Sequence, residues 1–250
     1  MRSATKSGFH VNIIIREHRR WIVEKYRLYE EEIDFIDTQL FKDNKNYHAW
    51  SYRIWLCKEF NLFDEEKENI DQFFIEDIKN NSAWNYRYFL FSQRFMKDES
   101  SQKEEISWTI ERIKQKPDNE ASWNYLSGWF PFYNFSCFGK QDQNKDEVKG
   151  NKFLKFEDFA EVEDFASKMM QNDCLFAISF IINLYLVEKR QVSPIMVLLD
   201  KLIEMDPIRS NYWNWNKQQL QKEVESNLYV PNSSIQKEKV QNSEEEEEKK

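Results

Sequence analysis

Apolar residues along this chain recur at intervals of three and four, the spacing that places them on one face of an α-helix. The isoleucines at positions 106, 110 and 113 are one example, and Ile33, Ile36 and Leu40 are another. The pattern predicts helices over about 12–26, 29–41, 46–60, 64–78, 81–95, 101–114, 119–128, 156–170, 174–189, 194–205 and 207–225. Asp64, Pro194 and Pro207 are the residues expected to start three of them.

The periodicity is absent from three stretches, and these set the domain boundaries. Residues 1–11 are polar and unpatterned, which predicts an N-terminal arm. Residues 132–155 contain a hydrophilic run with no apolar face and are expected to form a surface insertion. Residues 226–250 are rich in Asn, Gln, Ser, Lys and Glu, which predicts a disordered tail. The folded domain is therefore expected over residues 12–225.

The predicted helices carry a repeat of the form Asn-x-x-x-Trp-x-x-Arg. The best copy consists of Asn46, Trp50 and Arg53, and an eroded copy precedes it with Arg16 at the Trp position. The next two copies contain Asn80, Trp84 and Arg87, then Asn119 and Trp123 with Leu126 in place of Arg. The distance from Asn46 to Asn80, which we call the repeat interval, also separates the eroded copy from the best one. The interval to the third copy is slightly longer, and a remnant runs from Asn211 to Trp215.

Each residue of the repeat has a structural interpretation. Asn is a good N-cap because its side chain accepts from the unpaired amides of the first turn. The tryptophans at helical spacing are expected to pack in the core, and Arg53 and Arg87 are expected to form structural ion pairs between hairpins. One hairpin cannot bury its apolar face alone, whereas stacked hairpins can. The sequence therefore predicts an all-α fold, a right-handed α-α superhelix of TPR-like hairpins.

Composition excludes several functional classes. Four glycines and five prolines leave little material for phosphate-binding loops, so Rossmann and P-loop folds are not expected. A net charge of −8 does not favour nucleic acid. No charge-free apolar run of about 18 residues is present, and the first nine residues lack the apolar region of a signal peptide. We expect a cytoplasmic protein.

The cysteines and histidines do not suggest a metal site. Cys57, Cys137 and Cys174 are far apart, as is typical of reduced thiols in a cytosolic protein. The three histidines show no ligand spacing to one another or to the cysteines. A zinc site formed by this chain alone is not expected.

The repeats and their flanks resemble the protein prenyltransferase α-subunit family. The resemblance rests on whole phrases, Lys45 to Trp50, Asn80 to Asn85 and Asn119 to Leu126, together with Glu59 to Leu62. They are most similar to the α subunit shared by farnesyltransferase and type I geranylgeranyltransferase, and the Rab-type α subunit is a weaker match. The resemblance is strong from about Arg16 to Trp129 and thin afterwards.

The resemblance implies a heterodimeric enzyme. In the family, a crescent of helical hairpins wraps around a β subunit, and this β subunit carries the zinc and most substrate contacts. The implied activity is transfer of an isoprenoid from its diphosphate to the cysteine of proteins with a C-terminal CaaX motif. Magnesium could assist the diphosphate, and the donor could be farnesyl or geranylgeranyl.

The resemblance also implies site residues. The family is said to place a lysine and a tyrosine of a Lys-Asn-Tyr segment against the isoprenoid diphosphate, and these positions correspond to Lys45 and Tyr47. Lys45 is the expected catalytic residue, because an ammonium stabilises the charge of a departing diphosphate. Tyr47 and Asn80 are expected to bind the substrate.

The chain departs from the family pattern at its N-terminal end. Further repeats before Asn12 are absent, and the family's carboxylate-binding glutamine would fall near Ile14. This departure fits either a sequence that lacks its native upstream part or a diverged subunit. A non-catalytic helical-repeat scaffold that binds partners through its concave face is the alternative function.

Overall fold

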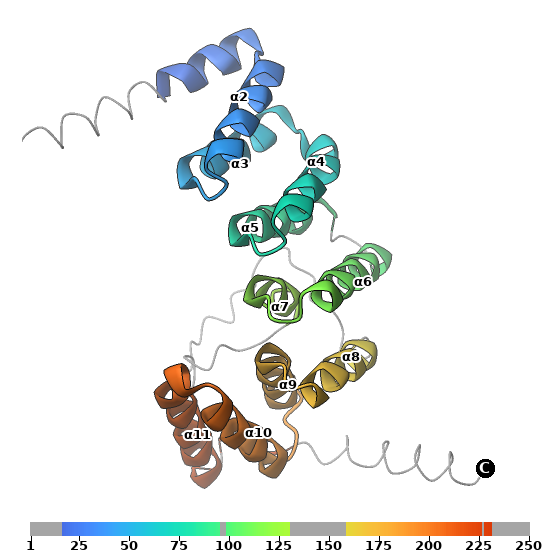
Figure 1. The fold of residues 1–250 in the computed structure, drawn as a ribbon, viewed down its shortest axis with the longest axis vertical. Coiled ribbons are helices and arrows are strands. Elements are labelled where there is room, and N and C mark those ends of the chain that lie inside the picture. The colour runs from blue at the N-terminus through green and yellow to red at the C-terminus, as the bar shows by residue number, and fades with distance from the viewer. Residues whose placement is uncertain (1–16, 96–98, 131–158, 227, 232–250) are drawn as a thin grey trace, which may run out of the picture. The chain divides into compact units, whose positions relative to one another are not determined.

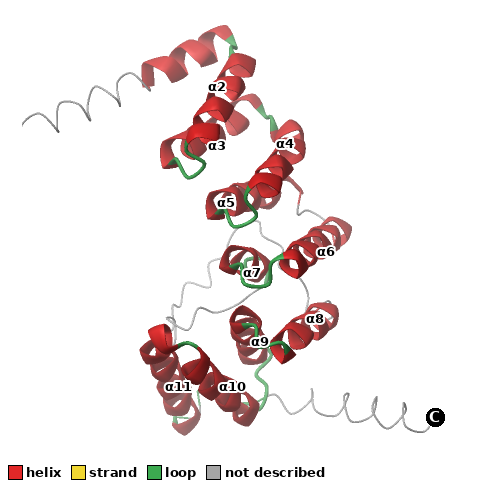
Figure 2. Cartoon of the chain, in the orientation of Figure 1, coloured by secondary structure: helices red, strands yellow, loops and turns green. Residues whose placement is uncertain are grey.

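A computed structural model describes residues 17–95, 99–130, 159–226 and 228–231. Every regular element in these ranges is a helix (Figure 1 and Figure 2). The predicted all-α fold built from helical hairpins is therefore confirmed. The predicted arm at 1–11, the predicted insertion at 132–155 and residues 232–250 of the tail predicted at 226–250 lie outside the described residues. Within that predicted tail, Tyr229 is described and is buried in the apolar core.

The chain divides into two compact units, Met1–Phe95 and Met96–Lys250. In the first, residues 17–26 are helical and precede α2 (Tyr29–Lys42), α3 (Tyr47–Phe60), α4 (Phe63–Glu76) and α5 (Asn81–Leu90). A short π-helical segment, η1 (Phe91–Phe95), continues α5. Helix α2 packs on α3, α4 packs on α5, and α3 also contacts α5, so consecutive hairpins stack within this unit.

The second unit contains the remaining helices. These are α6 (Glu99–Gln115), α7 (Glu120–Ser127), α8 (Phe159–Gln171), α9 (Leu175–Val187), α10 (Val192–Met205), the 3-10 turn η4 (Pro207–Arg209) and α11 (Ser210–Glu225). The pairs α6 and α7, α8 and α9, and α10 and α11 form antiparallel hairpins (Figure 1). None of the described helices is long and apolar enough to cross a lipid bilayer.

The asparagine of each repeat caps a helix, as its position predicts. The Asn46 side chain accepts from the amides of His48 at 3.0 Å and Ala49 at 3.2 Å. Asn80 caps α5 through the amide of Ser82 at 3.0 Å. Asn119 caps α7 in the same way through the Ala121 amide at 3.2 Å. These bonds satisfy first-turn donors that have no partner within the helix.

The tryptophan of each repeat closes the loop before its own helix. The indole Nε1 of Trp50 donates to the carbonyl of Asn44 at 2.9 Å. Trp84 and Trp123 make the equivalent bond to the carbonyl six residues earlier, at 2.8 Å and 3.0 Å. All three side chains are buried, so their predicted core role is confirmed. A buried indole normally needs a partner for its N–H, and the loop carbonyl supplies it.

The remnant at Asn211 does not reproduce this arrangement. Helix α11 has Arg209 as its N-cap, and Trp215 is 40% exposed. The buried residue is instead Trp213, whose Nε1 donates to the Asp206 carboxylate at 3.0 Å.

Helix α4 starts near Asp64 as predicted, but the predicted role of Asp64 as its N-cap is wrong. The helix begins at Phe63, and its N-cap is Leu62, whose side chain makes no cap bond. Asp64 and Glu65 instead lie in the first turn, where their negative charge offsets the positive end of the helix dipole. Glu66 also lies in this first turn, and its side chain is buried.

The two proline starts are also shifted. Helix α10 begins at Val192, so Pro194 lies within the first turn, where its missing N–H costs no hydrogen bond. Pro207 opens a 3-10 turn, and the α-helical part of the last segment begins three residues later at Ser210.

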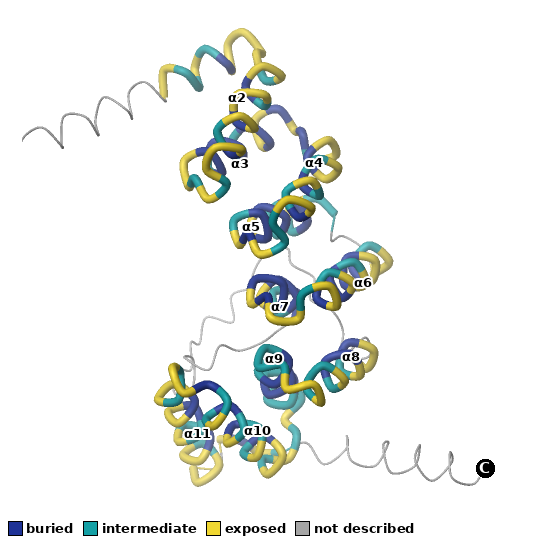
Figure 3. Tube along the Cα trace, in the orientation of Figure 1, coloured by how far each residue is buried: buried dark blue, intermediate teal, exposed yellow. Residues whose placement is uncertain are grey.

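Each unit has its own core, drawn dark blue in Figure 3. In the second unit, Trp123 packs against Phe165 at 5.8 Å and Phe180 at 5.9 Å between ring centroids, joining α7 to α8 and α9. A second apolar cluster joins α9, α10 and α11 and consists of Ile178, Ile182, Ile195, Leu199, Leu202, Trp213, Leu220 and Tyr229.

The Asn80→Ala substitution is expected to destabilise the protein by about 2 to 3 kcal/mol, measured by urea unfolding. It removes the α5 cap and also the bond from Asn80 Nδ2 to the Asn44 carbonyl at 3.0 Å. The matched control is Asn81→Ala, because Asn81 is the exposed neighbour within the helix. Equal effects of the two substitutions would show that the Asn80 bonds contribute nothing specific.

Candidate functional site

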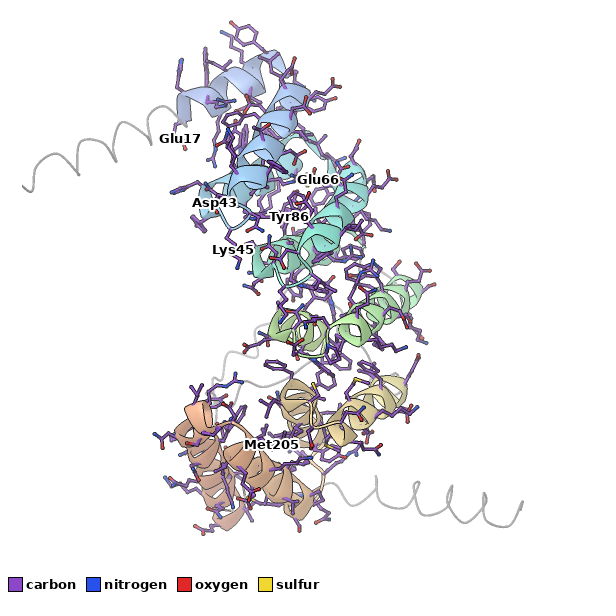
Figure 4. The ribbon with its side chains drawn as sticks, in the orientation of Figure 1. Glu17, Asp43, Lys45, Glu66, Tyr86 and Met205 are labelled. Atoms are coloured by element: carbon purple, nitrogen blue, oxygen red, sulfur yellow. The ribbon has the colours of Figure 1, made fainter. Side chains whose placement is uncertain are left out.

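Two of the three predicted site residues lie where α2 is joined to α3, Lys45 in the turn and Tyr47 as the first residue of α3. Lys45 is exposed, and its backbone amide donates to the Asp43 carboxylate at 3.3 Å. Tyr47 is 77% exposed, and its ring meets the edge of the His48 ring at 5.6 Å between centroids. Figure 4 shows Lys45 and Asp43 together at the end of this hairpin, away from the buried Glu66 and Tyr86.

The third predicted residue, Asn80, supports the same turn from the next hairpin. It is 1% exposed, and both polar atoms of its amide are bonded. Its Nδ2 donates to the Asn44 carbonyl, the same oxygen that accepts from the Trp50 indole. The structure therefore brings the three residues to one edge of the first unit, with Lys45 and Tyr47 open to solvent and Asn80 bonded beneath them.

The Lys45 ammonium is exposed and is in no salt bridge within the described part of the chain. No ion pair is formed between it and a described carboxylate, whereas Arg53 and Arg87 are both paired. Its main chain is fixed by Asp43 on one side and by the α3 cap on the other. An exposed cation on a well-anchored turn can be contacted by an anion without breaking an existing salt bridge.

The first unit also contains a buried polar network that the sequence pattern did not predict. The Arg53 Nε and Nη2 atoms donate to the Glu66 carboxylate at 2.6 Å and 2.9 Å, and Nη1 donates to Asp37. The Tyr86 hydroxyl donates to the same Glu66 carboxylate. Arg53, Glu66 and Tyr86 come from α3, α4 and α5, so the network joins three consecutive helices.

The network shifts the titration of its members. Burial alone would lower the pKa of Arg53, but the Glu66 carboxylate outweighs it and raises that pKa. Burial and Glu66 raise the pKa of Tyr86. Burial, with Glu66 nearby, raises the pKa of the Cys57 thiol to about 12. Arg53 therefore stays charged and Cys57 stays a thiol at neutral pH, which fits structural roles.

The expected ion pair between hairpins is confirmed for Arg53, whereas the Arg87–Asp71 pair lies within the α4–α5 hairpin. Arg53 bridges Asp37 on α2 and Glu66 on α4, and Arg87 pairs with Asp71 on α4 at 2.7 Å. Asp37 and Asp71 are separated by the repeat interval, as are the two arginines.

The Glu and Tyr residues of this network recur in the sequence at the same spacing as the repeat tryptophans. Glu32, Glu66 and Glu105 follow one another at the same intervals as the three repeat tryptophans, and so do Tyr52, Tyr86 and Tyr125. Glu32 pairs with Arg19 at 2.8 Å, and the Tyr125 hydroxyl donates to Glu105 at 2.5 Å. Searching for polar residues at the tryptophan spacing would have found them.

The second unit contains a cleft of about 690 Å³. Helices α7, α9 and α11 line it, with Arg209 at its edge held by Asp206 at 2.5 Å and Glu120 at 3.3 Å. None of the predicted site residues belongs to it. In the described ranges, no three His, Cys, Asp or Glu side chains lie so as to hold a metal ion.

The fold and the repeating polar residues define a helical-repeat protein. Comparison with known proteins shows which family of repeats it resembles. The family described as protein prenyltransferase alpha subunit repeat matches residues 29–60 and 63–94, which contain the hairpins α2–α3 and α4–α5. The chain therefore carries protein prenyltransferase alpha subunit repeats. The turn with Lys45 and Tyr47 lies inside the first of them.

Two relatives agree with this assignment. The protein farnesyltransferase/geranylgeranyltransferase type-1 subunit alpha of Pisum sativum is 30% identical over 121 residues, which cover 46% of this chain and 36% of that protein. The structure titled Candida albicans protein geranylgeranyltransferase-I complexed with GGPP matches with a TM-score of 0.58 and 28% identity. It covers 76% of this chain and 59% of the matched chain. The chain is thus similar to both of these proteins and spans less than two thirds of the length of each.

The Glu66→Gln substitution is expected to destabilise the first unit by about 3 to 5 kcal/mol, because it leaves the buried Arg53 without its main counter-charge. Chemical denaturation monitored by circular dichroism measures the loss. Glu65→Gln is the matched control, since Glu65 is the exposed neighbour in the same turn. A loss below about 1 kcal/mol at position 66 would contradict the structural role of the network.

Proposed function

We propose that this chain is the α subunit of a heterodimeric protein farnesyltransferase or geranylgeranyltransferase type I. The enzyme would transfer an isoprenoid from its diphosphate to the cysteine of proteins that end in a CaaX motif. The observation that carries the proposal is the match of two prenyltransferase alpha subunit repeats to the hairpins that hold Lys45, Tyr47 and Asn80.

In this proposal Lys45 acts on the leaving group. The thiolate of the substrate cysteine attacks C1 of the isoprenoid, a C–S bond forms, and the C1–O bond breaks. The electron pair of that bond goes to the diphosphate, whose negative charge grows. An ammonium already positioned near the departing oxygens stabilises this charge, and Lys45 is an exposed point charge on an anchored turn.

Tyr47 would help to bind the same diphosphate. Its phenol is exposed next to the lysine and can donate a hydrogen bond to a phosphate oxygen. Asn80 would support this site from below, because its amide is committed to the α5 cap and to the turn.

The exposure of Lys45 explains why a second subunit would be needed. A cation and an anion in open water attract each other weakly, and the attraction grows several-fold where protein excludes water. The turn is open to solvent in this chain, so a β subunit covering it would turn a weak surface contact into an effective one. The zinc that activates the thiol is assigned in this proposal to the β subunit, and magnesium to the diphosphate.

The test is co-expression with a farnesyltransferase β subunit, followed by an isoprenoid-transfer assay. The pair should purify as a 1:1 complex, and Lys45→Ala should lower kcat about 10²- to 10³-fold without changing assembly. Lys42→Ala is the matched control, because Lys42 is an exposed lysine of the same hairpin that the proposal gives no role.

Equal activity of the Lys45→Ala and wild-type complexes would overturn the role of Lys45 while leaving the subunit assignment intact. Failure to form any complex, with a folded chain that remains monomeric, would favour a helical-repeat scaffold instead.

A further inference from the structure

A cleft of about 260 Å³ opens on the first unit between the helical residues 17–26, α2 and α3. Its floor is apolar, and a few polar side chains stand at its edge. We refer to it as the α2–α3 cleft, and it is lined by Arg19, Phe35, Ile36, Gln39, Asn46, His48, Ala49 and Tyr52.

The next hairpin has an equivalent site, and there a side chain of this chain occupies it. One repeat interval further along the chain, Gln39 and Tyr52 correspond to Phe73 and Tyr86 of the next hairpin. There the place is filled by Trp50, with ring centroids 5.0 Å from Phe73 and 5.3 Å from Tyr86. The second site therefore binds the indole of the hairpin before it.

The sequence has no indole in register with the first site. Position 16 precedes Trp50 by the repeat interval and is occupied by arginine. The walls of the α2–α3 cleft are correspondingly more open than those of the filled site. Ala49 and Tyr52 are 8% and 7% exposed, against 0% and 1% for their equivalents Ala83 and Tyr86.

The chemistry of the cleft suits an aromatic ring. Ile36 and Ala49 form an apolar floor, and Phe35, which is 40% exposed, carries the Arg19 guanidinium on its ring at 3.8 Å. A cavity of about 150 Å³ with apolar walls is already large enough to bind benzene. Aromatic rings also gain about 0.5 to 1.5 kcal/mol from ring contacts beyond the area that they bury.

Tyr52 also differs from its equivalent in the next hairpin. The Tyr86 hydroxyl donates a direct hydrogen bond to Glu66. The Tyr52 hydroxyl is near Glu32 and Arg19 but makes no such direct bond to either. The first site thus differs from the second in its missing ring and in the looser contact of its tyrosine.

We propose that the α2–α3 cleft is a docking site for a tryptophan side chain presented by a partner polypeptide. The partner's indole would occupy the position that Trp50 occupies in the following hairpin. This interaction does not depend on the proposed transferase activity, because it uses the shape of the repeat and not the Lys45 turn. The partner must satisfy its own indole N–H, as Trp50 does through the Asn44 carbonyl.

The experiment titrates N-acetyl-L-tryptophanamide into the full chain and follows the methyl groups of the protein by NMR. The Ile36 and Ala49 methyl signals should shift as a ring enters the cleft, with a Kd on the order of 1 mM for so small a probe. Ile70 and Ala83 are the internal controls, because they stand at the equivalent positions of the site that Trp50 already fills.

Two variants and a second probe complete the test. Arg16→Trp restores the repeat and should weaken probe binding at least tenfold, whereas Arg16→Ala should leave it unchanged. N-acetyl-L-leucinamide should bind at least fivefold more weakly than the tryptophan probe.

Three results would overturn the proposal. The first is the absence of shifts at Ile36 and Ala49 in the full chain at tenfold the expected Kd, or shifts of the same size at Ile70 and Ala83. The second is equal binding by the Arg16→Trp variant or by the leucine probe. The third is binding only by a chain shortened to begin at Glu17, which would mean that this protein's own first residues take the site.

Discussion

The first unit depends on one buried carboxylate. Glu66 is 1% exposed and lies among α3, α4 and α5, where an unpaired charge would cost several kcal/mol. Arg53 and Tyr86 must therefore reach it from the two neighbouring helices. Parts of this arrangement recur in the neighbouring hairpins, where Glu32 pairs with Arg19 and Glu105 accepts from Tyr125.

The same arrangement separates structural residues from those available for function. The cap asparagines and the tryptophans fix the loops between helices, and Asn80 also holds the Asn44 turn of the preceding hairpin. Side chains that point outward from these loops carry no packing role, as the 77% exposure of Tyr47 shows. A helical-repeat chain can thus present a lysine and a tyrosine to a partner subunit on a turn whose backbone is already ordered.

Local features of the fold can be predicted from the sequence. Asn46, Asn80 and Asn119 are identifiable as caps because they bond amides two or three residues away. Trp50, Trp84 and Trp123 are identifiable as core because they recur at a regular interval within helical patterns. The Arg53–Glu66–Tyr86 network is not detectable from local patterns, because its members lie on separate helices and meet only when three helices pack. Asp64 is a wrong prediction for the N-cap of α4, because the helix begins at Phe63 and Asp64 lies inside its first turn. The repeat pattern shows that Arg16 stands at a Trp position, but the α2–α3 cleft itself becomes visible only when the helices pack.

The most direct measurement of this account is a double-mutant cycle on the buried pair, using Arg53→Met, Glu66→Met and the double variant in equilibrium unfolding. Each single variant leaves one buried charge without its main partner, whereas the double variant leaves neither. The account predicts that the double variant is at least about 2 kcal/mol more stable than the sum of the single losses implies. Losses that simply add would show that the two residues stabilise the unit independently and would contradict the central role of the pair.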